Sequence, residues 1–143
     1  MEIFNKKIIK KAFSLVELLV VISIIATLTA ILLPNLMGAR ERGNDSKKKQ
    51  EMTNIKNSLR LFYNDTQNYP DVADMTELGT TLLPYMPSIN SIGYTYEYSQ
   101  TAGGDGFWLR TQTEATNNIE NLESQSRCGI ATTDPAYYYV CAF

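Results

Sequence analysis

The sequence predicts an α+β fold in which one long N-terminal helix, hydrophobic at first and kinked at a proline, packs through its C-terminal half against a small antiparallel β-sheet. Three observations lead to this prediction. An almost uncharged apolar run covers residues 13–33, a helical stripe of apolar side chains follows over residues 52–62, and short alternating segments typical of strands come after residue 93. A chain of 143 residues is long enough for one domain of ordinary size.

The apolar run has the length of a membrane-spanning helix. It contains a single charged residue, Glu17, and as a helix it would be about 31 Å long, close to the hydrocarbon thickness of a bilayer. Four lysines precede it within residues 1–12, and this predicts a cytoplasmic N-terminus and an exported remainder. We therefore expect a single pass through the inner or cytoplasmic membrane, with residues 13–34 as the spanning helix.

The basic segment before the helix is expected to be a leader peptide. An ordinary secretory signal has a shorter apolar stretch with a small-residue cleavage site after it. Here the small residue, Ala12, comes before the apolar run instead. Cleavage between Ala12 and Phe13 would remove residues 1–12 and keep the helix.

Glu17 is the most informative single residue. An ionised carboxylate one turn into an apolar helix is costly, and such a residue usually has a partner. If the chain is cut before Phe13, the new α-amino group of a neighbouring subunit supplies one. The alternative is a side chain that reaches back toward the cytoplasmic headgroups, and the residues alone favour neither.

Residues 35–66 are expected to continue the helix in amphipathic form. Pro34 lacks a backbone N–H and crowds the preceding turn, which predicts a kink there rather than an end. Met52, Ile55, Leu59 and Phe62 are spaced by three, four and three residues and should form the stripe that carries the head. Residues 44–51 show no stripe and are expected to be a solvated stretch, with contact of Lys47–Lys49 to headgroups or to the acidic head of another subunit as the alternative.

Residues 67–143 are expected to form the globular head. Proline and glycine between residues 71 and 93 predict a loop with a short helix near Met75–Leu83. Alternation predicts three strands, and a glycine-rich turn at residues 103–106 makes the first two a hairpin. Residues 114–126 are polar and are expected to be a loop. The strands are predicted to cover residues 94–99, 107–113 and 137–143.

The composition of the head bears on its chemistry. Residues 61–143 carry two basic and ten acidic side chains, which argues against nucleic acid as a partner. The chain has no histidine, and its hydroxyl residues in the apolar run have no base nearby, so we expect no enzyme. Cys128 and Cys141 predict a disulfide in an oxidising compartment, with two buried free thiols as the alternative.

A cofactor is not expected. Asp105, in the glycine-rich turn, and Asp134, in a later loop, are weak candidates for calcium, which takes several oxygen ligands. No run of acids at alternate positions accompanies them, so solvated carboxylates are the preferred interpretation.

The segment Lys-Lys-Ala-Phe-Ser-Leu-Val-Glu-Leu-Leu, residues 10–19, resembles the processing site of type IV pilins and type II secretion pseudopilins. The shared pattern is a basic leader, a small residue, an aromatic at the new N-terminus, Glu four residues later and a proline near the end of the helix, here Pro34. The resemblance is strong over residues 6–40. It departs from the family at Ala12, where glycine is usual.

The resemblance implies cleavage by a prepilin peptidase after Ala12, N-methylation of Phe13, and assembly through Glu17. It implies as partners further copies of the chain in a helical homopolymer, the pilus or secretion assembly machinery, and the membrane before assembly. The expected product is an extracellular or periplasmic filament. A pilus (fimbrium) subunit, a major pseudopilin of type II protein secretion, and a bitopic membrane-anchored binding protein are the three functions to be compared.

Overall fold

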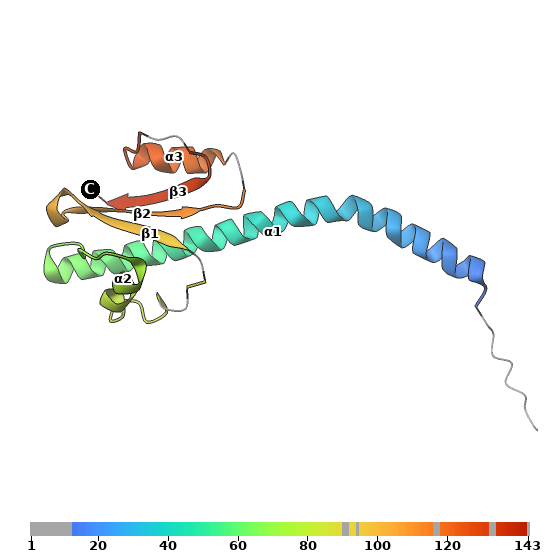
Figure 1. Ribbon diagram of the computed structural model, residues 1–143, viewed down its shortest axis with the longest axis horizontal. Coiled ribbons are helices and arrows are strands. Elements are labelled where there is room, and N and C mark those ends of the chain that lie inside the picture. The colour runs from blue at the N-terminus through green and yellow to red at the C-terminus, as the bar shows by residue number, and fades with distance from the viewer. Residues whose placement is uncertain (1–12, 90–91, 94, 116–117, 132–133, 143) are drawn as a thin grey trace, which may run out of the picture. The chain divides into compact units, whose positions relative to one another are not determined.

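The computed structural model contains three helices, three strands and a short 3₁₀ turn among its described residues (Figure 1). The expected leader, residues 1–12, and Tyr94 lie outside these residues. The chain divides into two compact units, Met1–Met37 and Gly38–Phe143. The described residues are 13–89, 92–93, 95–115, 118–131 and 134–142, and the elements are α1 (Leu15–Thr66), α2 (Met75–Leu82), β1 (Tyr96–Thr101), η2 (Ala102–Gly104), β2 (Gly106–Gln112), α3 (Ile119–Arg127) and β3 (Tyr137–Ala142).

The described part of the first unit is the N-terminal portion of α1. All of its side chains are exposed, and α1 is long and apolar enough at this end to cross a membrane. The hydroxyls of Ser23, Thr27 and Thr29 donate to carbonyls one turn back, so that these polar groups remain compatible with an apolar surrounding. The helix continues through Pro34, as predicted, and the kink expected there stays a prediction.

The second unit is built on a three-stranded antiparallel sheet of order β1-β2-β3. Leu109, on the central strand, pairs with Tyr98 on one side and with Val140 on the other. Phe107 and Leu109 are fully buried, and their face of the sheet packs in one core with the predicted α1 stripe. That core contains Met52, Ile55, Leu59, Tyr69, Leu78, Leu82, Met86, Ile89, Tyr96, Phe107, Leu109 and Val140.

The hairpin turn between β1 and β2 is held against the end of α1. Gly103 and Gly104 have φ of 68° and 109°, a backbone region that favours glycine. The side chain of Asn68 leaves no room for a Cβ on Gly104, and the N–H of Tyr69 donates to the Gly104 carbonyl at 2.8 Å. The turn was predicted from its glycines; the positive φ accounts for both of them, and the contact with Asn68 is a second reason at Gly104 only.

The prediction of a loop at residues 114–126 is wrong, because most of these residues form helix α3 (Ile119–Arg127). Asn118 caps this helix by accepting the N–H of Glu120. The face that packs inward is polar, and the apolar Ile119 and Leu122 point to solvent. Hydrophobic periodicity therefore gave no signal for this element. The buried side chains of α3 are Asn121, Ser124 and Gln125.

The expectation that residues 44–51 form a solvated stretch is wrong at two positions. Asp45 is 3% exposed and Lys48 is 9% exposed, since the segment after β2 lies over this part of α1. Within its own chain, Lys49 Nζ lies 2.7 Å from Glu120 of α3. Contact of the lysine run with headgroups or with another subunit stays a prediction.

Candidate processing and assembly site

The N-terminal end of α1 carries the residues predicted for processing. Ala12 lies outside the described residues, and Phe13 is 81% exposed. Ser14 precedes the first helical residue, Leu15, and its N–H donates to Glu17 Oε2 at 2.9 Å. This is one half of a capping box, in which an acidic side chain reaches back to a free N–H at the helix start.

The geometry gives Glu17 a partner within its own chain. A carboxylate at a helix N-terminus is favoured by the helix dipole, and it accepts more than one hydrogen bond. The bond from Ser14 therefore leaves Glu17 able to accept from a second donor, such as an α-amino group. Sequence reasoning found Glu17 but missed this bond, although the spacing Ser-x-x-Glu was visible at residues 14–17.

A pair of buried charges joins α1 to the segment after β2. Asp45 accepts the N–H of Glu114 at 2.8 Å through one oxygen and that of Ala115 at 3.0 Å through the other. Lys48 Nζ donates to the Gln112 carbonyl at 3.0 Å and lies 3.6 Å from Glu114. We call this the Asp45–Lys48 contact. It fixes the position of α1 relative to the end of β2 and the segment that follows this strand.

A sequence signal for this contact existed. Asp45, Lys48, Met52, Ile55 and Leu59 are spaced by three, four, three and four residues. The two charged residues therefore continue the apolar stripe on the same helix face. A search for apolar residues alone stops at Met52, whereas the buried face extends two turns further.

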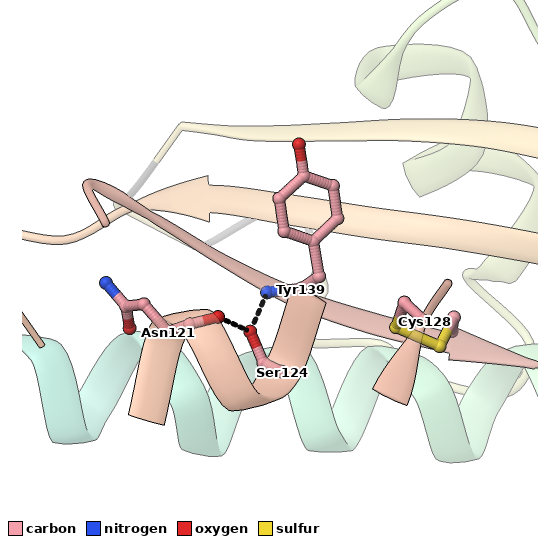
Figure 2. The surroundings of a disulfide bond; sticks show 5 residues. Asn121, Ser124, Cys128 and Tyr139 are labelled. Atoms are coloured by element: carbon pink, nitrogen blue, oxygen red, sulfur yellow. Dashed lines mark hydrogen bonds between the residues drawn. A yellow bond between two sulfur atoms is a disulfide. The ribbon is translucent and has the colours of Figure 1, made fainter. Parts of the chain in front are cut away.

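The predicted disulfide is present and joins α3 to β3. Cys128 caps the C-terminus of α3, and Cys141 lies in β3. Figure 2 shows Ser124 between the two elements: its Oγ donates to the Asn121 carbonyl at 2.6 Å and accepts the Tyr139 N–H at 2.9 Å. The helix is thus held to the strand by one covalent bond and by a hydrogen bond to the strand backbone.

Arg110 lies on the face of the sheet that points away from the core, where it contacts several other side chains. Its guanidinium donates to Glu97 and, at 3.2 Å, to the Tyr139 hydroxyl, and it lies 4.9 Å from the ring centroid of Tyr137 and 5.5 Å from that of Trp108. The hydrogen bonds to Tyr139 and then to Glu97 raise the pKa of Arg110 above its ordinary value. This arrangement is cross-strand packing, as expected for aromatic residues on strands.

The two weak calcium candidates are not brought together. Asp105 accepts from the Tyr63 hydroxyl at 3.4 Å and lies just before β2, where that strand pairs with the end of β3. Asp134 accepts the Ala136 N–H at 2.9 Å just before β3, at the other end of the same ladder. Among the described residues, no group of three or more histidine, cysteine or acidic side chains is placed to hold a metal ion.

The fold and the site define a class: an exposed apolar helix with one carboxylate in its first turn, continued into a small α+β head. Residues 9–33 match the prokaryotic N-terminal methylation motif. The chain is 32% identical over 103 residues to the type II secretion system core protein G of Escherichia coli (strain K12), covering 70% of this chain and 71% of that protein. It is 33% identical over 98 residues to the type IV wide pilus major component PilA4 of Thermus thermophilus, covering 67% and 75%.

No solved structure matches the chain significantly. The two relatives and the motif show that the chain belongs to the family of type IV pilins and type II secretion pseudopilins. Members of this family are structural subunits and not enzymes. The apolar helix and the family agree with anchoring in the inner membrane before assembly.

Proposed function

We propose that the chain is the structural subunit of a type IV pilus-like filament. A prepilin peptidase cuts it between Ala12 and Phe13, Phe13 is N-methylated, residues 13–34 hold it in the membrane, and the same helix then packs in the filament core. The single observation that carries the proposal is Glu17, a carboxylate in the first turn of a helix whose apolar side chains are exposed over residues 15–37.

The physical argument concerns what surrounds that helix. So large an exposed apolar surface requires either lipid or other copies of the same helix. In either surrounding an unneutralised carboxylate is expensive, and a copy displaced along the filament axis would leave it unpaired. The α-amino group of a neighbouring Phe13 satisfies Glu17 at one axial position, so the charge pair fixes the register while the apolar surface supplies the attraction.

The first test is the intact mass of the membrane-extracted chain, measured with and without reduction and alkylation. We expect a mass that begins at methylated Phe13, with both cysteines protected until reduction. A mass that retains residues 1–12 would instead describe a bitopic anchored protein, and the filament proposal would lose its main support.

The second test is the variant Glu17→Ala. We expect it to be cleaved and inserted in the membrane at the normal level, while sheared filaments counted by electron microscopy fall by about tenfold or more, the effect of losing a charge pair worth over 1.4 kcal/mol. Glu41→Ala, an exposed glutamate on the same helix beyond the apolar run, serves as the matched control. Normal filament yield from Glu17→Ala would contradict the pairing.

A second candidate is the major pseudopilin of a type II secretion system. It is favoured by the similarity to core protein G, which extends well beyond the N-terminal helix. The Cys128–Cys141 disulfide supports the pilus instead, since pilins often close their C-terminal region in this way. Deletion of the gene distinguishes the two: loss of surface fibres supports the pilus subunit, and loss of secreted proteins with fibres unchanged supports the pseudopilin.

A further inference from the structure

Three basic side chains gather beside the disulfide. Lys56 and Arg60 of α1 and Arg127 of α3 line an open pocket of about 660 Å³, whose other wall is formed by β3. None of the described residues that line this pocket has a carboxylate side chain. We call these three residues the basic pocket.

The charges in the basic pocket repel one another. Burial lowers the pKa of Lys56, and the positive charges of Arg60 and Arg127 lower it further. The ion pairs found among the described residues use Lys48, Lys49 and Arg110, and none uses a residue of the basic pocket. Unpaired like charges around a concave surface are the arrangement that binds an anionic partner.

The same chain carries a segment of complementary charge. Residues 61–109 contain no lysine or arginine, and the exposed Asp65, Asp71, Asp74 and Glu77 lie within one segment of this range. We call residues 65–77 the acidic segment. It leads into α2, which packs beside β1, whereas the basic pocket is bounded by β3. The strands β1 and β3 are the two outer strands of the sheet, so the α2 end of the acidic segment and the basic pocket lie against different strands.

We infer that the basic pocket receives the acidic segment of a second copy of the chain when heads lie side by side, an inference that rests on the filament function proposed above. A contact between two different surfaces of the same chain is heterologous, and it repeats from copy to copy without closing. Opposite charges at such a contact favour one orientation of neighbouring heads and disfavour the others. The apolar helices would then supply cohesion, and the heads would supply orientation.

Charge reversal tests the contact in the full-length chain. We expect Arg60→Glu with Arg127→Glu to reduce filament yield by about tenfold or more, the range for opposed charges at an interface, and Asp71→Lys alone to do the same. Combining the three changes should give a higher yield than Arg60→Glu with Arg127→Glu alone, since Asp71→Lys supplies a cation to the new carboxylates, while Asp65, Asp74 and Glu77 keep the rest of the acidic segment negative. Glu41→Lys, an exposed reversal on α1 outside both the basic pocket and the acidic segment, should leave the yield unchanged.

A folding control separates assembly from stability. Because the three cations repel one another, Arg60→Gln should leave the thermal unfolding midpoint of the detergent-solubilised chain unchanged or raise it. A lowered midpoint would mean that an acid of the same chain already neutralises the pocket, and this would overturn the inference.

Zero-length carbodiimide cross-linking then identifies the occupant. Filaments assembled from isotopically heavy and light chains should yield cross-links between Lys56 of one chain and the acidic segment of the other. Cross-links of Lys56 confined to one chain, or directed to another acid, would overturn the inference. If the wild type forms no filaments, the proposed function fails first; if it does and the reversals have no effect, the inference alone fails.

Discussion

Asp45 shows how much a single buried carboxylate contributes to joining the helix and the head. Both of its oxygens accept backbone N–H groups that lie about seventy residues away in sequence. Asp45→Ala would leave both N–H groups without an acceptor, and we expect unfolding free energy to fall by about 2–4 kcal/mol. Asp45→Asn, which keeps one acceptor oxygen, should lose less.

Denaturant unfolding of the detergent-solubilised chain measures this effect. Ser46→Ala, a change at the neighbouring exposed position, is the control and should leave the midpoint unchanged. Equal stability of Asp45→Ala and Ser46→Ala would show that the Asp45–Lys48 contact does not hold the head to α1.

Tyr98 makes the fold sensitive to alkali. Burial, and then interaction with Tyr69 and Asp71, raises its pKa above the ordinary value of 10.0, while its hydroxyl donates to the Pro70 carbonyl at 2.8 Å. Above pH 10 the unfolded chain loses this proton and the folded chain keeps it, so stability falls as pH rises, by at most about 1.4 kcal/mol per pH unit.

Tyr98→Phe should therefore lose about 1 kcal/mol at neutral pH, where the hydrogen bond is present, but it should show a shallower decline above pH 10. Unfolding midpoints measured between pH 7 and pH 11 test this. Parallel declines for the two proteins would mean that Tyr98 is not the group responsible.

At the scale of elements, the disulfide joins β3 to α3, the helix that has no regular apolar spacing. Its partners are 13 residues apart, and closing such a loop stabilises by about 3 kcal/mol in the chain-entropy model. Cys128→Ser with Cys141→Ser should lower stability by about that amount, and hydrogen exchange at the Tyr139 N–H should accelerate first as α3 leaves β3. A reductant should reproduce the loss in the wild type and have no effect on the double variant. A double variant as stable as the wild type would contradict this assignment.

The elements that the sequence predicted are those with regular apolar spacing. Helix α1 beyond Pro34, the short helix α2, the hairpin and the last strand all have a period or a glycine turn that local rules detect. Helix α3 has neither, because its inward face bonds through Asn121, Ser124 and Gln125 instead of packing apolar groups. The Asp45–Lys48 contact was missed for the same reason: a polar residue is buried only when a distant segment pairs with it.

The functional residues also differ in whether the sequence alone reveals them. Phe13, Glu17 and Pro34 belong to a local motif and could be named from a short stretch of sequence. The basic pocket unites α1 and α3 residues that are far apart in the chain, and no local rule brings them together.

At the scale of the whole molecule, the core is confined to the second unit. Every buried side chain among the described residues lies between Asp45 and Val140. We therefore expect a chain of residues 38–143 to fold on its own, to unfold cooperatively, and to remain monomeric without the apolar helix. Circular dichroism and gel filtration check this. An unfolded product would show that the first unit contributes to the stability of the head.

The hydrogen bond from the Tyr139 N–H to Ser124 would have a further consequence in the proposed filament, where many heads lie close together. An open strand invites another strand, and heads crowded in a polymer would otherwise be well placed to build cross-β aggregates. Here α3 packs against the outer strand β3, and α2 packs against the other outer strand, β1. In such a filament the covered outer strands would keep neighbouring heads from pairing through their sheets.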